Sequence, residues 1–406
     1  MKGETTMKGE TTMKANRLRK LQAFGQSIWL DYIRRDLIVS GELRRLIEAD
    51  GLRGITSNPS IFEQAIAGSH DYDEDIRSMA LQGQSTMKIY EALVLRDVQN
   101  AADEFRLVYN NTDGKDGYVS LEVNPHLAHD TAGTIQEARR LWDALDRPNV
   151  FIKVPATTEG LPAIQQLISE GINVNVTLLF GLPRYRQVAE AYLAGIETRV
   201  AQGKPVQLVA SVASFFVSRI DGLVDPLVEK FIAQHSHEPD SHEPDSREPD
   251  SRKTEFAQQA RGQVAIASAK MAYRIYLEIF GSNRFKKLAD RGARVQRLLW
   301  ASTGRKNPDY SDVKYVEALI GADTVNTIPV ETLDAYRDHG DPNARIEEDV
   351  EQAERLLTRL PELGINLDAV TQQLEDEGVE KFSKPFDKLM EMLLKRVYAN
   401  EGRVIS

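Results

Sequence analysis

Short apolar runs rich in β-branched and aromatic residues alternate along this chain with longer stretches whose apolar residues recur at helical spacing. Helical patterns include residues 133–145, 161–171 and a long one at 256–281. Eight strands separated by helices predict an α/β fold in which a parallel sheet closes into a (β/α)8 TIM barrel. The predicted strands are residues 27–33, 53–58, 117–124, 149–156, 172–179, 206–216, 294–303 and 322–329.

A doubly wound open sheet is the competing arrangement for alternating strands and helices. The chain does not support it, because no glycine-rich G-x-G-x-x-G turn follows the first predicted strand. From about residue 343 onward the pattern is helical only, at 344–360 and 386–400. We therefore expect additional C-terminal helices packed on the barrel.

Two segments consist of short repeats. Residues 1–14 contain the unit MKGETT twice, and residues 237–251 contain HEPDS twice and REPDS once. Such polar segments cannot bury enough apolar surface to offset chain entropy, so both are predicted to be disordered. We therefore expect one barrel domain at 15–397, with a disordered insertion at 234–253 and a C-terminal tail at 398–406.

The composition narrows the class of protein. The chain has 406 residues, 51 Lys and Arg against 61 Asp and Glu, a net charge of -10 and no cysteine. The missing cysteines exclude disulfides, thiolate metal sites and cysteine nucleophiles. The acidic balance argues against a nucleic-acid partner, and no apolar run approaches the ~20 residues of a membrane span. No apolar core of a secretory signal is present at the N-terminus, and we expect a cytoplasmic protein without a membrane partner.

A lysine in the fourth strand is the most informative polar residue. Lys153 lies in NVFIKVPAT, in the middle of an apolar run, and would therefore lie inside the barrel. Burial disfavours the ammonium form, and a neutral amine is a nucleophile toward carbonyls. A structural interpretation stays open, in which the side chain extends to the rim or pairs with Asp31 or Glu122.

Two acidic residues on other strands are candidate proton-transfer groups. Alternation in SLEVN places Glu122 on the face opposite Leu121 and Val123, and the outer face of a parallel barrel packs on helices. An inward Glu122 is therefore favoured over a solvated strand-end charge. Asp31, in the first strand, is a candidate acid or base, with a rim or helix cap as its structural alternative.

Other charged residues carry weaker signals. Arg219, Arg305 and Lys306 follow the sixth and seventh strands, where barrel enzymes hold phosphate groups, although each alone fits an ordinary surface cation. His126 and His129 lack an evident third metal ligand, so loop or capping roles are favoured. The same holds for the histidines in or beside the insertion, which are His235, His237 and His242.

Several segments, taken in order, resemble the transaldolase family, in its longer bacterial type. The similarity runs from about residue 20 to about residue 397 and is interrupted by the HEPDS repeats. The segments are DGLRGITSNPSIFEQAI (50–66), NVFIKVPAT (149–157), INVNVTLLF (172–180), ASFFVSRIDGLVD (213–225), WASTGRKNPDYSD (300–312) and ADTVNTIPVETLDAY (322–336).

The resemblance implies a barrel of the class I aldolase kind with no metal and no organic cofactor. It implies transfer of a dihydroxyacetone unit from sedoheptulose 7-phosphate to glyceraldehyde 3-phosphate, giving erythrose 4-phosphate and fructose 6-phosphate in the pentose phosphate pathway. The expected partners are therefore small sugar phosphates. The sequence leaves the oligomeric state open, with a homodimer among the alternatives.

The resemblance also implies a role for individual residues. Lys153 would form the imine, Glu122 would transfer protons through a water held by Thr177, and Asp31 would take the proton of the C4 hydroxyl. The residues implied in substrate binding are Asn58, Asn175, Ser214 and Phe216, with Arg219, Ser302 and either Arg305 or Lys306 at the phosphate. Arg305 departs from the smaller residue expected in many relatives, which leaves the choice between it and Lys306 open.

Two other functions compete with this one. A fructose-6-phosphate aldolase uses the same barrel and lysine but releases dihydroxyacetone. Such aldolases are expected to resemble Gln and Tyr at the positions of Glu122 and Phe216, so the sequence favours transfer. A non-catalytic sugar-phosphate-binding barrel would have lost the lysine or both carboxylates, and all three are present.

Overall fold

The computed structural model describes residues 16–235 and 247–401, and these form a closed barrel of eight parallel strands in sequential order. All eight predicted strands are found, each shorter than its apolar run. The strands are β1 (Gln26–Asp31), β2 (Gly54–Thr56), β3 (Tyr118–Glu122), β4 (Val150–Pro155), β5 (Val174–Leu179), β6 (Ser211–Phe216), β7 (Arg297–Ala301) and β8 (Thr324–Ile328). The prediction of a (β/α)8 barrel is therefore confirmed.

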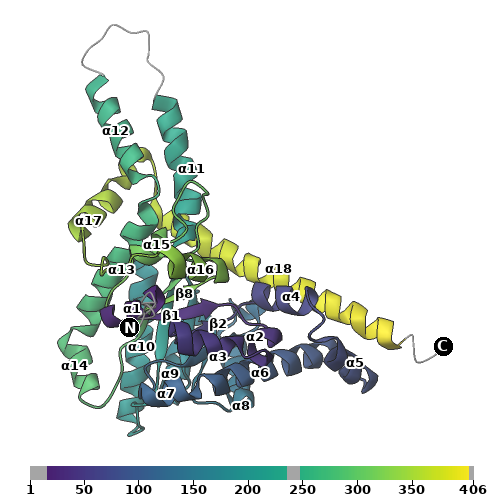
Figure 1. Ribbon diagram of the computed structural model, residues 1–406. Coiled ribbons are helices and arrows are strands. Elements are labelled where there is room, and N and C mark those ends of the chain that lie inside the picture. The colour runs from purple at the N-terminus through teal and green to yellow at the C-terminus, as the bar shows by residue number, and fades with distance from the viewer. Residues whose placement is uncertain (1–15, 236–246, 402–406) are drawn as a thin grey trace, which may run out of the picture.

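Helices surround the barrel (Figure 1). The α-helices before β6 are α1 (Arg17–Lys20), α2 (Arg35–Val39), α3 (Glu42–Arg45), α4 (Pro59–Ala67), α5 (Asp73–Leu81), α6 (Thr86–Glu104), α7 (Arg106–Asn111), α8 (Thr131–Leu145), α9 (Gly160–Glu170) and α10 (Leu182–Ala201). Those after β6 are α11 (Ser218–His235), α12 (Arg247–Ala260), α13 (Val264–Phe280), α14 (Asn283–Ala289), α15 (Lys314–Glu317), α16 (Val330–His339), α17 (Val350–Arg359) and α18 (Leu367–Glu401). Short 3-10 turns are η1 (Leu21–Phe24), η3 (Pro125–Leu127) and η5 (Leu360–Leu363), and η2 (Leu46–Asp50) is a π-helical turn.

Strand register decides which side chains enter the barrel. Paired residues of parallel strands point to the same face, and alternate residues along each strand share a face. Ser27 pairs with Val325, Glu122 with Lys153, and Lys153 with Asn175. The interior therefore receives alternate residues of every strand, while the apolar residues between them pack against the helices.

An aromatic layer fills the middle of the barrel. The ring centroids of Tyr118 and Phe151 are 4.3 Å apart, and Trp29 stacks on Phe151 at 6.0 Å. Gly54 makes room for this layer, since a Cβ atom there would lie 2.6 Å from the Trp29 ring. These aromatic side chains close the barrel at this level, so the polar residues beyond them face the carboxyl ends of the strands.

The structure corrects two expectations about helices beside the repeats. The predicted helix at 256–281 is broken into α12 and α13, because Gly262 takes a left-handed conformation with φ of 67°. Residues 247–253, expected within the disordered insertion, belong to α12, and residues 234–235 complete α11. Phe256 and Ala257 anchor α12, and a helix extends easily from an anchored nucleus. Residues 236–246 lie outside the described residues.

The last helix, α18, crosses the carboxyl end of the barrel, whereas α17 packs on α13. α18 contacts β5, α4, α6 and α11, and Figure 1 shows it running past α4 to the end of the chain, while α11 and α12 project together from the barrel. A tail was expected from residue 398, but α18 continues to Glu401 because buried Val397 anchors its last turns. The expected N-terminal tail at 1–14 and the last residues, 402–406, lie outside the described residues.

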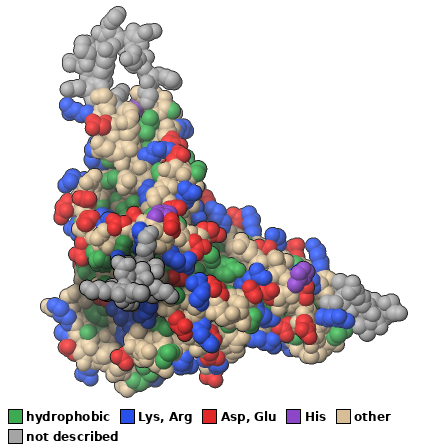
Figure 2. All heavy atoms as spheres, viewed as in Figure 1, with side chains coloured by type: hydrophobic (Ala, Val, Ile, Leu, Met, Phe, Trp, Pro, Cys, Tyr) green, Lys and Arg blue, Asp and Glu red, His purple; other side chains and the backbone are tan. Residues whose placement is uncertain are grey.

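The surface mixes both signs of charge. On the face in Figure 2, Lys and Arg side chains are interspersed with Asp and Glu. Among the helices of residues 16–235 and 247–401, none combines the length and apolar composition that a membrane crossing requires.

Candidate active site

Three neighbouring strands bring a carboxylate, an amine and an amide together inside the barrel. Glu122, Lys153 and Asn175 are register partners on β3, β4 and β5. All three are buried, with 8%, 4% and 0% of their surface exposed. Lys153 therefore points into the barrel instead of extending to the rim, and the expected inward orientation of Glu122 is observed.

The Lys153 amine has three close neighbours from separate parts of the chain. Its Nζ donates to the carbonyl oxygen of Ser57 at 2.9 Å and lies 3.5 Å from Glu122 Oε2. The Phe382 ring of α18 lies over the amine, with its centroid 5.7 Å away. Of the carboxylate partners left open by the sequence, Glu122 is the one observed. One face of the amine is thus held by polar groups and another by an aromatic ring.

Glu122 is placed to exchange a proton near neutral pH. Burial raises the pKa of its carboxyl to about 7, although the Lys153 charge lowers it. Neither carboxylate oxygen has a hydrogen-bond partner of good geometry among the described residues. Since buried polar atoms are rarely left unpaired, these oxygens indicate a place for a water molecule or a substrate group.

The Thr177 hydroxyl is also unpaired and buried among the described residues. Thr177 pairs with Pro155 across β4 and β5, two residues beyond the pair formed by Lys153 and Asn175. Its side chain therefore enters the barrel one layer above the amine. A hydroxyl at this level can hold a water molecule or a substrate oxygen near the amine.

Asp31 approaches the same interior from β1. Its Oδ1 accepts a hydrogen bond of 2.8 Å from Thr56, whose hydroxyl lies 2.6 Å from that of Thr327. Burial raises the pKa of Asp31, while the charge of Lys153 and the Thr56 hydrogen bond lower it. The carboxyl can therefore both accept and return a proton.

The polar side chains expected to bind sugar hydroxyls are connected to one another. Ser214 donates to Asn175 Oδ1 at 2.7 Å, and Asn175 Nδ2 donates to Ser120 Oγ at 3.1 Å. Asn58 caps α4, where its Oδ1 accepts from the Ile61 amide at 3.0 Å. The structure therefore fixes Asn175 and Ser214 inside the barrel and places Asn58 at its edge.

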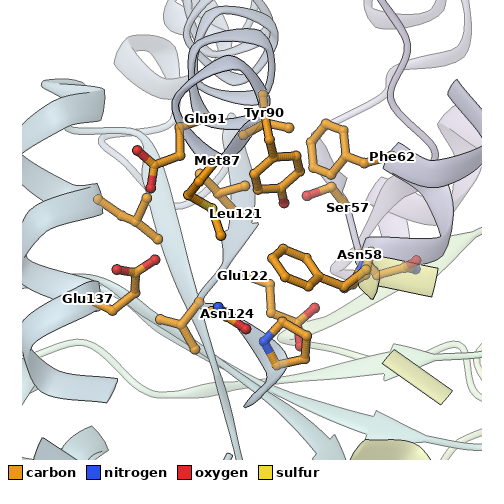
Figure 3. Close-up of a pocket in the computed structure, with 16 residues that line it drawn as sticks. Ser57, Asn58, Phe62, Met87, Tyr90, Glu91, Leu121, Glu122, Asn124 and Glu137 are labelled. Carbon is orange, nitrogen blue, oxygen red and sulfur yellow. The ribbon is translucent and has the colours of Figure 1, made fainter. Parts of the chain in front are cut away.

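A pocket adjoins Glu122 (Figure 3). Asn58 and Asn124 line it from the ends of β2 and β3, and Tyr90 lines it from α6. Two further carboxylates, Glu91 and Glu137, lie on its helical side, and both pair with Arg140. The pocket thus lies between the ends of β2 and β3 and the helices that cover them.

Two cations, Arg219 and Lys306, lie near Asp31. Burial lowers the pKa of Arg219, whereas the negative charge of Asp31 raises it. The Arg219 guanidinium lies 5.2 Å from the centroid of the Phe216 ring. Burial and the nearby Arg219 charge also lower the pKa of Lys306. Arg219 Nη1 is buried without a partner among the described residues. This rim therefore presents positive charge to an anionic group.

The structure separates the two residues that the sequence left as alternatives. Both residues are exposed, and Arg305 donates to the carbonyl oxygens of Pro308 and Tyr310, within its own loop. Lys306 instead interacts electrostatically with Arg219 and Asp31. Ser302, in a left-handed conformation with φ of 56°, places its hydroxyl 3.1 Å from that of Ser218. Lys306 and Ser302 thus border the positive rim, and Arg305 faces its own loop.

Four residues of the site received no role from the sequence. Thr56 and Ser57 follow the second apolar run, and Ser120 alternates with Glu122 along β3, so strand parity could have identified them. Phe382 lies more than two hundred residues from Lys153 in the chain. The helical pattern of α18 shows which residues are apolar, but not which turn crosses the barrel.

The histidines considered as metal ligands have separate partners. His126 contacts Asp387 at 2.7 Å, and His129 contacts Glu159 at 3.2 Å. His235 contacts the Phe231 carbonyl oxygen at 2.8 Å. The first two therefore bind different elements, as loop or capping residues do. His237 and His242 lie outside the described residues.

Known proteins resemble this chain over nearly its whole length. A family model described as Transaldolase/Fructose-6-phosphate aldolase matches residues 28–393. A "Transaldolase" from Trichodesmium erythraeum is 47% identical over 94% of this chain and 98% of that protein. "Transaldolase 2" from a Nostoc species is 47% identical over 93% and 97%, and a "Transaldolase" from Thermobifida fusca is 43% identical over 94% and 99%. The chain therefore belongs to the transaldolase/fructose-6-phosphate aldolase family.

Proposed function

We propose that this protein transfers a dihydroxyacetone unit from sedoheptulose 7-phosphate to glyceraldehyde 3-phosphate. The products are erythrose 4-phosphate and fructose 6-phosphate, as in the non-oxidative pentose phosphate pathway. One observation carries the proposal: the buried amine of Lys153 lies 3.5 Å from the buried carboxylate of Glu122, inside a barrel with a positive rim. A nucleophile beside a proton-transfer group is the arrangement that imine formation needs.

The first step forms a covalent bond between enzyme and ketose. The Lys153 amine adds to the ketone carbon, and the resulting carbinolamine loses water to give a protonated imine. Glu122, with its pKa of about 7, takes the amine proton and returns a proton to the departing hydroxyl. The Thr177 hydroxyl, unpaired among the described residues, holds the water molecule through which these protons pass.

The second step breaks the bond between C3 and C4 of the bound ketose. Asp31 removes the proton of the C4 hydroxyl, so that an aldehyde forms and leaves. The electron pair of the broken bond moves into the protonated imine, which becomes an enamine on Lys153. When the acceptor aldehyde binds, the enamine attacks its carbonyl carbon, and Asp31 returns the proton to the new hydroxyl.

Substrate binding divides between the two sides of the barrel. Asn58, Asn175 and Ser214 bind the hydroxyls of the three-carbon unit, whose carbonyl carbon lies at Lys153. Phe216 borders the path toward the phosphate. The residues at the phosphate are Arg219, Ser302 and Lys306, and the contacts of Arg305 with its own loop favour Lys306 over Arg305.

Borohydride trapping tests the covalent step. Fructose 6-phosphate and borohydride are expected to add a reduced three- or six-carbon unit to the peptide that carries Lys153. The Lys153→Ala protein should give no adduct and no turnover while it keeps its circular dichroism spectrum. Lys270 offers a control, because it is also a buried lysine but donates to the Glu348 carbonyl oxygen away from the barrel interior. An adduct on Lys270, or on no lysine, would contradict the mechanism.

The release of dihydroxyacetone distinguishes transfer from simple cleavage. Without an acceptor aldehyde, a transferase should hold the enamine and release dihydroxyacetone slowly from fructose 6-phosphate. Adding erythrose 4-phosphate should raise turnover strongly. If release without acceptor were as fast as transfer, the protein would act as a fructose-6-phosphate aldolase instead.

A further inference from the structure

The proposed reaction leaves two acidic residues of α11 without a role. Asp221 and Asp225 are buried, one turn apart on the helix that begins beside Arg219. A buried carboxylate is stable only when it is paired or hydrogen-bonded. Asp221 accepts a hydrogen bond from Tyr315 of α15, and Asp225 accepts one from Tyr310 in the loop between β7 and α15, residues 302–313, which carries Ser302 and Lys306. We call these residues the phosphate loop.

Asp225 connects the phosphate loop to the break between α12 and α13. Its Oδ2 accepts a hydrogen bond of 2.6 Å from the Tyr310 hydroxyl. Its Oδ1 accepts one of 2.7 Å from the amide of Gly262, the left-handed residue in that break. One carboxylate therefore joins three segments: α11, the phosphate loop and the start of α13.

Asp221 repeats this arrangement one turn earlier. Its Oδ2 accepts from the Tyr315 hydroxyl at 2.8 Å, and its Oδ1 accepts from the Ala265 amide at 2.8 Å. Lys314 Nζ lies 3.9 Å from the same Oδ2. Burial raises the pKa of Asp221 to about 6, so the side chain is ionised at neutral pH. Its two oxygens can then accept the bonds from Tyr315 and Ala265.

The Tyr310 ring is also held by cations. Lys314 Nζ lies 3.5 Å from the ring centroid, and the Arg261 guanidinium lies 6.0 Å from it. Arg305 donates to the Tyr310 carbonyl oxygen at 3.2 Å. Both the ring and the backbone of Tyr310 are thus fixed, which is unusual for a residue in an exposed loop.

The two ends of this network border the positive rim. α11 places Arg219 there, the phosphate loop places Lys306 and Ser302 there, and Ser218 and Ser302 meet at 3.1 Å. We propose that Tyr310 and Asp225 are positioning residues that hold the phosphate loop against α11, so that Lys306 and Arg219 face one phosphate group together. This inference rests on the proposed function, because that function places a phosphate at this rim.

A positioning role predicts a selective effect. The network lies behind the rim and contacts neither Lys153 nor the two catalytic carboxylates in the described structure. Its loss should therefore weaken binding of phosphorylated substrates and leave the chemistry at Lys153 unchanged. A purely structural role would instead affect phosphorylated and unphosphorylated substrates equally.

The test compares Tyr310→Phe with a matched control, Tyr336→Phe, because the Tyr336 hydroxyl is buried without a partner among the described residues. For Tyr310→Phe the KM for glyceraldehyde 3-phosphate should rise about tenfold, the loss expected for a hydrogen bond to a charged group. Its kcat, and kcat/KM for unphosphorylated glyceraldehyde, should change by less than about twofold. Tyr336→Phe should leave all three values unchanged.

A second variant tests the pair directly. Asp225→Asn cannot accept both the Gly262 amide and the Tyr310 hydroxyl, and should raise the same KM. Combined with Tyr310→Phe, it should add little further loss, because its remaining oxygen can accept from Gly262. The positioning role would be overturned if the two variants had fully additive effects on KM, or if they weakened the use of glyceraldehyde 3-phosphate and of glyceraldehyde equally.

The two proposals fail in different ways. If the wild-type protein showed no transfer, or no preference for glyceraldehyde 3-phosphate over glyceraldehyde, the proposed function would fail and the positioning role with it. If the wild type showed that preference and Tyr310→Phe kept it in full, only the positioning role would be overturned.

Discussion

Glu122 and Lys153 are register partners on β3 and β4, and their side chains meet inside the barrel with 3.5 Å between Oε2 and Nζ. The pairing of adjacent parallel strands is what brings them together, since paired residues share a face. Backbone hydrogen bonds therefore determine the distance between the proposed nucleophile and its proton-transfer partner. A rigid scaffold of this kind suits a reaction with several proton transfers.

Glu122→Gln should remove the pH dependence of imine formation. With a pKa of about 7, Glu122 is protonated below that pH and ionised above it. The proposed step uses the ionised form to take up a proton, so the wild-type rate should fall as the pH drops below 7. In Glu122→Gln the rate should be about a hundredfold lower and independent of pH in this range. Borohydride quenching at successive times and pH values measures it.

Thr177→Val is the control for this pH profile. It removes the hydroxyl that is proposed to hold the water molecule but leaves the titrating carboxyl in place. The rate should fall about tenfold, within the range for a lost hydrogen bond, while the decline below pH 7 persists. If Glu122→Gln kept the same decline, another group would be responsible for it.

Asp31→Asn should separate imine formation from carbon–carbon cleavage. The asparagine keeps an acceptor for the Thr56 hydroxyl, which lies 2.8 Å from Asp31 Oδ1, but cannot take the C4 proton. The variant should form the borohydride adduct with the six-carbon sugar at a near-normal rate. Release of glyceraldehyde 3-phosphate should slow by at least about a hundredfold. Mass mapping of the adduct distinguishes the six-carbon from the three-carbon unit, and cleavage at the full rate would exclude the role given to Asp31.

Phe382→Leu should let water reach the enamine. The Phe382 ring lies 5.7 Å from Lys153 Nζ and is 3% exposed, so it covers one side of the amine. A smaller side chain admits water to a site where exclusion of water protects a reactive intermediate. Release of dihydroxyacetone without an acceptor should therefore rise relative to transfer. Leu394→Ala, on an exposed part of the same helix, should release no more than the wild type.

The barrel could be predicted because the alternation of strands and helices is a local pattern that can be seen in the sequence. The sequence also predicts the inward Glu122 and Lys153, since a charge amid apolar residues on a strand leaves one favourable face. The contacts of Arg305 could not be predicted, because they depend on which carbonyl oxygens of its own loop accept from it. The break at Gly262 was missed because its amide bonds a distant carboxylate, Asp225, which no local pattern reveals.

Arg297 closes the amino-terminal end of the barrel, opposite the site. It is 5% exposed, and it donates to Asp116 Oδ1 at 3.0 Å and to Ser27 Oγ at 2.7 Å. Arg297→Met would leave the buried carboxylate of Asp116 without this cation, although Asp116 Oδ2 would still accept from Ser27. Removing one member of a buried ion pair costs about 3–5 kcal/mol.

Urea unfolding should therefore show a loss of about 3–5 kcal/mol for Arg297→Met. Arg274→Met is the matched control, because Arg274 and Glu354 form an exposed pair on the surface, where such a pair contributes at most about 1 kcal/mol. The folded Arg297→Met protein should retain its kcat, because the aromatic layer of Trp29, Tyr118 and Phe151 separates this end from Lys153. Equal losses in the two variants would show that the buried pair does not stabilise the barrel beyond an ordinary surface contact.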